Sequence, residues 1–235
     1  MTGNAQRTSH SSRRTHAAKL ACAAAAVPVL LVAGCSSGSS GESGSADKSK
    51  ASPSAAPVKF KQLPDACKTL SKGTVKELTP KSDNPSGKRI GSGNSGDSGS
   101  CLWSGLKKFD YRQLTVSLKR FDSDTSRGSG DKLAGAYLKQ QTDAVQSDKS
   151  NKGVKTTKVN GLGDQALSVS NTIKKKNGKG KAETFREERL VVRSANVVVS
   201  VDYAGAGFEN GKTPSAADLR KKAAKAAKEA VAALK

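Results

Sequence analysis

The residues of this 235-residue chain best suited to nucleophilic or metal chemistry are two histidines and four cysteines. They are His10, His16, Cys22, Cys35, Cys67 and Cys101. A histidine beside a serine and a carboxylate would support acyl transfer, and histidines with cysteines are typical ligands of zinc. Three of the six lie within the first 34 residues, so the chemistry open to this protein depends on the fate of that segment.

Residues 1–34 have the pattern of an export signal. Four basic residues and no acidic residue precede an apolar run of 14 residues, Leu20–Ala33. That run is too short for the roughly 20 residues that a membrane-spanning helix needs. It leads into Leu31-Val32-Ala33-Gly34-Cys35, which resembles the lipobox of bacterial lipoproteins, where cleavage leaves the cysteine as a lipidated N-terminus. We therefore predict a signal peptide over 1–34, lipidation of Cys35, and a location on the outer side of the cell membrane.

Two alternatives to the lipoprotein signal stay open, namely an ordinary secretory signal that contains a cysteine and a buried apolar helix. The export route is open as well, because Ser12-Arg13-Arg14 is part of a twin-arginine motif, but His16 and Ala17 stand where that motif has bulky apolar residues.

Cleavage before Cys35 would change the chemistry that the chain can perform. It removes both histidines, Cys22 and four basic residues from a chain with 41 Lys+Arg and 20 Asp+Glu, which leaves a net charge of +17. Without histidine, the Ser-His-Asp and Cys-His mechanisms and the usual zinc sites are excluded. We therefore expect no catalytic residue, no metal and no cofactor.

A pair of carboxylates could still support glycoside hydrolysis. Glu187 and Glu188 are adjacent, but neighbouring residues of a strand point to opposite faces of the sheet. We interpret them as solvated strand charges, so a carboxylate-dependent hydrolase is the least favoured function.

The mature chain divides into a linker and a domain. Residues 36–57 are almost entirely Ser, Gly, Ala and Pro with a few charges, and such a segment cannot bury enough apolar surface to become ordered. We predict a flexible N-terminal tether over 35–57, beginning at the lipidated Cys35, with a typical reach of about 25 Å. The globular extracytoplasmic domain then spans 58–235.

Hydrophobic patterning within the domain predicts both helices and strands. Helical turns are expected over 64–78, and helices over 131–148 and 215–234; strands are expected from Leu114 and over 154–159 and 166–173. The clearest feature is a hairpin that joins residues 184–193 to 197–203 across Ala195-Asn196, with one core face and one solvent face. Its register would pair Val192 with Val199, Leu190 with Val201, and Arg189 with Asp202.

Cys67 and Cys101 are the cysteines that remain after lipidation of Cys35. An exported protein can form disulfides, and two remaining cysteines allow only one pairing, so a bond between Cys67 and Cys101 is favoured. Closing this 35-residue loop would stabilise the fold by about 3 to 4 kcal/mol. Two free thiols are the alternative.

Five lysines surround Asn177-Gly178 in a predicted turn. They are Lys174, Lys175, Lys176, Lys179 and Lys181. A hairpin tip that carries them would project a positive field toward an anionic partner. Export would separate this surface from nucleic acid, so the candidate partners are anionic envelope polymers or an envelope protein. The alternative is that these lysines only keep the domain soluble.

Three short motifs suggest a family. Asp65-Ala66-Cys67, Gly99-Ser100-Cys101-Leu102-Trp103-Ser104 and Gly161-Leu162-Gly163-Asp164-Gln165-Ala166 occur in an order that resembles actinobacterial surface lipoproteins with a secreted two-cysteine domain of unknown function. The similarity would cover about residues 60–235. It implies an α+β fold with a curved antiparallel sheet and helices packed on it, a Cys67–Cys101 disulfide, and Trp103 in the core beside that bond. It implies no catalytic residues.

These observations predict a lipid-anchored, non-enzymatic binding or accessory module of the cell envelope. In this hypothesis the basic hairpin and the C-terminal helix contact the anionic partner. The alternative is an extracytoplasmic domain that binds a small molecule or signal in a pocket between the sheet and the helices, near Trp103.

Overall fold

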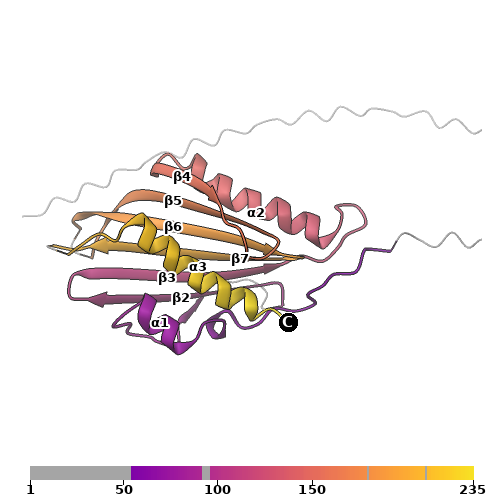
Figure 1. Cartoon of the computed structure of the whole chain (residues 1–235), viewed down its shortest axis with the longest axis horizontal. Helices are drawn as coiled ribbons and strands as arrows, with labels where there is room; N and C mark the ends of the chain where they lie inside the picture. The colour runs from indigo at the N-terminus through magenta and orange to yellow at the C-terminus, as the bar shows by residue number, and fades with distance from the viewer. Residues whose placement is uncertain (1–53, 92–95, 179, 210) are drawn as a thin grey trace, which may run out of the picture. The chain divides into compact units, whose positions relative to one another are not determined.

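An antiparallel sheet of seven strands, in the order β1-β2-β3-β7-β6-β5-β4, forms the centre of the fold (Figure 1). The computed structural model describes residues 54–91, 96–178, 180–209 and 211–235. The strands are β1 (Lys88–Ile90), β2 (Ser98–Lys107), β3 (Asp110–Arg120), β4 (Lys152–Lys158), β5 (Gln165–Lys176), β6 (Ala182–Ser194) and β7 (Val197–Gly207). The predicted signal peptide, Cys35 and most of the predicted tether lie outside the described residues.

The helices are the 3-10 turn η1 (Ala66–Lys68), α1 (Lys72–Leu78), α2 (Gly130–Ser147) and α3 (Ala216–Ala232). Serine side chains cap three of them: the Oγ atoms of Ser71, Ser129 and Ser215 accept backbone N–H groups of the first turn. In the chain order, α2 crosses from β3 to the far edge of the sheet, and the meander β4 to β7 then returns to pair with β3. The predicted α+β class, with helices packed on an antiparallel sheet, is confirmed.

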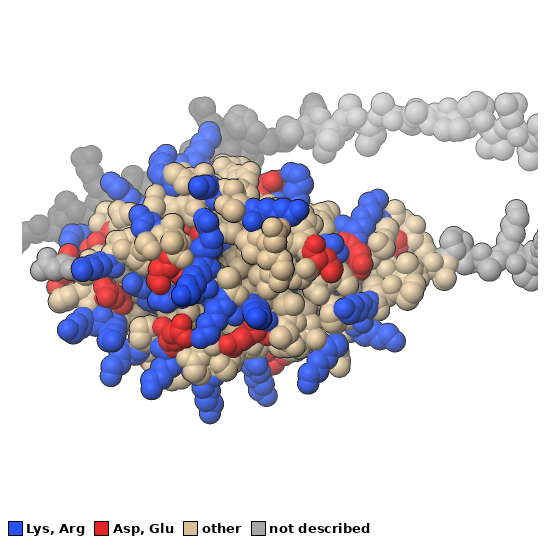
Figure 2. Space-filling view, viewed as in Figure 1, with Lys and Arg blue, Asp and Glu red and all other residues tan. Residues whose placement is uncertain are grey.

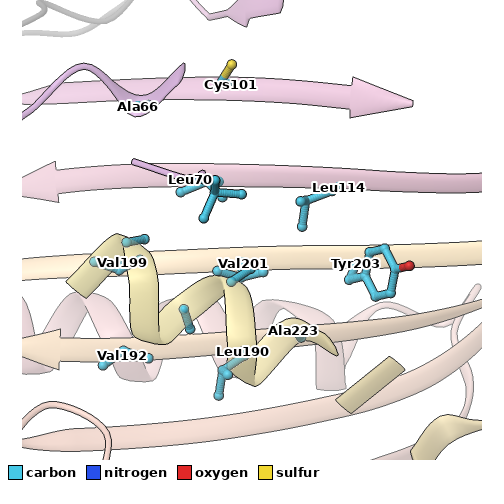
Figure 3. Close-up of a cluster of buried hydrophobic side chains, with 14 of the residues drawn as sticks. Ala66, Leu70, Cys101, Leu114, Leu190, Val192, Val199, Val201, Tyr203 and Ala223 are labelled. Carbon is cyan, nitrogen blue, oxygen red and sulfur yellow. The ribbon is translucent and has the colours of Figure 1, made fainter. Parts of the chain in front are cut away.

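Residues of β2, β3, β6 and β7 alternate so that one sheet face is apolar (Figure 3). On this face α3 packs mainly on β6 and β7, and η1 packs on β2. Leu114, Val199, Val201 and Tyr203 are at most 2% exposed on this face. The facing side of α3 is a row of small side chains, among them Ala223, which lets the helix lie close to the sheet. The predicted packing of this helix against the sheet is confirmed.

The hairpin β6–β7 has the register that the sequence predicts, with Val192 opposite Val199 and an ion pair between Arg189 and Asp202. The prediction that its second face is solvent-exposed is wrong. Val191 and Val198 on that face are buried against Ala134 and Leu138 of α2. The alternation of side chains along the strands identified the two faces of the hairpin. It could not show that α2 crosses over the sheet and covers the second face.

A disulfide joins Cys67 to Cys101 and fastens η1 to β2, as the cysteine count and the family resemblance both predict. Trp103 is 1% exposed in the same core, two residues from Cys101. Gly87 covers this site with φ +80°, and a Cβ there would lie 2.4 Å from Cys101 Sγ and 2.7 Å from the Trp103 ring. The absence of a side chain at Gly87 therefore allows the loop to lie directly on the disulfide.

Candidate functional site

One end of the sheet collects the lysines of three separate segments. The β2–β3 turn, the β5–β6 turn and the end of β7 lie together there, because Asp110 pairs with Gly207 and Arg186 pairs with Gly205 (Figure 1, left). We call this the lysine end. In the described part of the chain it consists of Lys107, Lys108, Lys174, Lys175, Lys176, Lys181 and Lys212.

The structure places Lys174, Lys175, Lys176 and Lys181 on the tip of the β5–β6 hairpin, as the sequence predicts. Lys179 lies outside the described residues. Two of the lysines are paired: Lys175 with Glu187, and Lys181 with Glu183 at 3.5 Å. Among the described residues, no carboxylate lies within 4.0 Å of the ammonium groups of Lys107, Lys108, Lys174, Lys176 or Lys212. The lysine end therefore carries an excess of positive charge, and blue side chains project from it in Figure 2.

The lysine end also carries apolar side chains. Leu106 is 48% exposed and Phe109 is 43% exposed, and they are the large hydrophobic residues that the described structure leaves exposed. Behind them, Tyr111 stacks on Phe208 with ring centroids 5.4 Å apart, and the Phe208 N–H donates to the Phe109 carbonyl. The β2–β3 turn thus presents two lysines and an aromatic ring on a rigid base.

The β2–β3 turn is a candidate functional element that the sequence patterns above do not predict. The signal was present in Leu106-Lys107-Lys108-Phe109, where two apolar residues flank two lysines at a turn. This motif becomes significant because the lysine-rich β5–β6 turn lies at the same end of the sheet. The two turns are about 70 residues apart in the chain, so only the folded sheet brings them to one end.

A groove of about 1140 Å³ lies beside the disulfide, between η1 and α1 on one side and the loop 81–89 on the other. We call it the disulfide groove. Leu70 and Val75 line it, as do Cys67 and Pro85. Lys68, Lys72, Lys76 and Lys81 also border it. The small-molecule hypothesis expects a pocket between the sheet and the helices near Trp103. This groove instead lies between two helical segments and a loop, and Gly87, which lines it, lies against Trp103.

A smaller, polar cavity of about 490 Å³ lies on the opposite face of the sheet, beside the C-terminal half of α2. Glu187 and Asp202 both line it. Each is already engaged: Glu187 by Lys175 and the Asn171 amide, and Asp202 by Arg189. The two acids of the hydrolase hypothesis, Glu187 and Glu188, do not converge here, because the Glu188 carboxylate bonds to groups on the other face of the sheet.

Glu188 is a correction to the sequence analysis, which interpreted it as a solvated charge. Its side chain is fully buried on the α3 face, where it accepts from the Ser168 hydroxyl and lies 3.5 Å from Arg220 Nε. Burial raises the pKa of this carboxyl above its ordinary value near 4.5, although Ser168 and Arg220 act in the opposite direction. The alternation itself contained the signal, because Glu188 falls on the same face as Leu190 and Val192.

Replacing Glu188 by Gln is expected to stabilise the protein by about 1 kcal/mol at pH 7 and above. A carboxyl whose pKa is raised by folding binds its proton more tightly in the folded state. Its contribution to stability is therefore full below about pH 4.5 and is lost as the pH rises through the folded pKa. Urea unfolding of wild type and Glu188→Gln from pH 4 to pH 8 should give curves that diverge as the pH rises. A less stable variant at pH 7 would show that the Arg220 pair outweighs burial.

The described residues contain no group of three or more His, Cys, Asp or Glu side chains placed to hold a metal ion. No helix among them has the length and apolar character needed to cross a membrane.

Comparisons with known proteins do not assign a family. No family model matches this chain, and no curated protein matches it. Among solved structures, the chain is similar to LpqN, which is described as involved in cell envelope biogenesis of Mycobacterium tuberculosis. The TM-score is 0.31 and the identity 12%, over 60% of this chain and 87% of that chain. Similarity at this level does not establish a common fold, so the role of LpqN is not transferred to this protein.

Proposed function

We propose that this protein is a lipid-anchored, non-enzymatic module of the cell envelope that binds anionic surfaces through its lysine end. The observation that carries the proposal is that two turns and the end of β7 bring together, at one end of the sheet, the exposed Phe109 and several lysines that have no ion pair among the described residues. The predicted export signal and lipidation of Cys35 would bring this end within reach of envelope anions.

The combination of charge with an exposed ring favours an anionic bilayer surface over a wall polymer. Each lysine near an anionic membrane contributes about 1 kcal/mol of binding energy, and this attraction falls off within a Debye length. An aromatic ring adds interfacial contact that a hydrated polymer does not offer, because its apolar body can enter the headgroup region. At this end, five lysines have no ion pair among the described residues. Together with Phe109 they would bind an anionic surface through several weak contacts that add up.

The test uses a chain that starts at Ser36, so that neither signal nor lipid contributes to binding. It should co-sediment with vesicles that contain phosphatidylglycerol, should not co-sediment with phosphatidylcholine vesicles, and should be released by 0.5 M salt. The triple variant Lys107→Gln, Lys108→Gln, Phe109→Ser is expected to weaken vesicle binding about tenfold or more, because two charges and the ring are lost together.

The matched control removes two exposed charges at the opposite end of the sheet, with Lys132→Gln in the first turn of α2 and Lys158→Gln at the end of β4. It should bind vesicles within about twofold of wild type. Equal losses in the triple variant and this control would contradict the proposal, because binding would then follow total charge. Retention on cell-wall polymer with none on anionic vesicles would contradict it as well.

A further inference from the structure

The disulfide groove is built independently of the lysine end. Its floor contains Leu70 and Val75, which are 8% and 3% exposed. Cys67 continues this floor beside the disulfide, and Pro85 lines the groove from the loop. The groove therefore offers a mainly apolar lining, although it lies at the surface of the domain.

The loop 81–89, which forms the second wall, is held to the sheet at both of its ends. Ser82 forms a backbone bridge to Gly105 of β2, and the chain rejoins the sheet as β1, which pairs with β2. Between these points, the Asn84 side-chain amide donates to the Gly87 carbonyl at 2.9 Å, and the Gly87 N–H donates to the Asn84 carbonyl at 3.0 Å. Gly87 itself lies on the disulfide and Trp103. The groove is thus preformed, which reduces the ordering cost of binding.

The rim of the groove is cationic. Lys68, Lys72 and Lys76 follow one another at intervals of four residues along η1 and α1, and Lys81 stands at the start of the opposite wall. All four are exposed, and none forms an ion pair with a described residue within 4.0 Å. Arg89 also lines the groove, but its charge is matched by Asp65. The groove therefore has an excess of four positive charges over an apolar floor.

We propose that the disulfide groove binds a single-chain amphiphile, with its acyl chain along the floor and its anionic head at the lysine rim. A free inorganic anion would leave the apolar floor unused, and a neutral chain would leave the lysines unused. The volume of about 1140 Å³ lies just above the range of roughly 300 to 1000 Å³ typical of small-molecule sites, which suits a long chain.

The experiment compares oleate with oleyl alcohol, which carry the same chain and differ in head-group charge, each below its aggregation concentration. The reporter is the fluorescence of Trp103, the single Trp of the chain, because it lies under Gly87 at the groove. Oleate is expected to bind at least tenfold more tightly than oleyl alcohol to the chain that starts at Ser36. Inorganic phosphate at the same concentrations should leave the fluorescence unchanged.

The variant Lys72→Gln, Lys76→Gln should lower the affinity for oleate about three- to tenfold without changing that for oleyl alcohol. The matched control, Lys107→Gln with Lys108→Gln at the lysine end, should leave oleate affinity unchanged. Equal affinities for oleate and oleyl alcohol would overturn the inference, as would an unchanged oleate affinity in the groove variant. Because the groove and the lysine end share no residue, loss of vesicle binding and loss of oleate binding are separable results.

Discussion

Asn196→Ala is expected to lower the free energy of unfolding by about 3 to 5 kcal/mol, although Asn196 stands in a two-residue turn. The side chain is fully buried and makes three hydrogen bonds to backbone groups. Its Oδ1 accepts the Phe60 N–H at 2.9 Å, and its Nδ2 donates to the carbonyls of Phe60 and Phe121 at 2.8 and 2.9 Å. Alanine would leave three backbone groups without partners, and a buried unsatisfied group costs about 1 to 3 kcal/mol.

Urea unfolding followed by circular dichroism measures this loss. Asn196→Asp keeps the acceptor but loses both donors, so it should also destabilise the protein. The neighbouring variant Ala195→Gly is the control for the turn itself. Ala195 has φ +46°, a left-handed conformation that glycine adopts without strain, so this variant should stay within about 1 kcal/mol of wild type. A loss below 1 kcal/mol in Asn196→Ala would show that water replaces the amide.

Removing the disulfide with Cys67→Ala and Cys101→Ala is expected to cost about 3 to 4 kcal/mol. The bond closes a loop of sequence separation 34, and its loss increases the conformational freedom of the unfolded chain. Cys101 is also fully buried, so alanine there removes packing around Trp103. Urea midpoints of the oxidised protein and the double variant provide the measurement.

Reduction of the wild type in urea should reproduce most of this loss, because it opens the same loop without changing the core volume. If reduction and the double substitution lower the free energy of unfolding by amounts that agree within about 1 kcal/mol, the loss of stability is due to opening of the loop. A double variant as stable as the oxidised wild type would contradict the expectation.

Local patterns predicted those parts of the fold in which partners are close in sequence. The alternation of Leu190 and Val192 with their partners Val199 and Val201 set the hairpin register, because a slip of one residue would move every apolar side chain to the other face. The same pattern would also have placed Glu188 in the core, but its charge was taken as evidence of exposure. Composition favours exposed glutamates in general, and here Ser168 and Arg220 accommodate a buried one.

The candidate sites were less predictable than the fold. The lysines of the β5–β6 tip were identified from the sequence. That Phe109 lies at the same end of the sheet follows only from the strand order, which places the β2–β3 turn beside the end of β7. The disulfide groove could be anticipated only as a pocket near Trp103. Its walls come from α1 and from a loop that is polar in sequence and follows no hydrophobic period.

Sequence patterns alone favoured the pairing of Cys67 with Cys101 and predicted the register of one hairpin and the placement of charge at another hairpin tip, and the family resemblance implied the α+β class. The cysteine pairing follows from counting, and the hairpin register and the charged tip follow from short local patterns in the chain. Three features are visible only in the folded protein. The second face of the β6–β7 hairpin is covered by α2, Asn196 bonds to three backbone groups, and lysines border an apolar groove. These features depend on contacts between segments up to 136 residues apart, which chain topology and packing set and local periodicity does not encode.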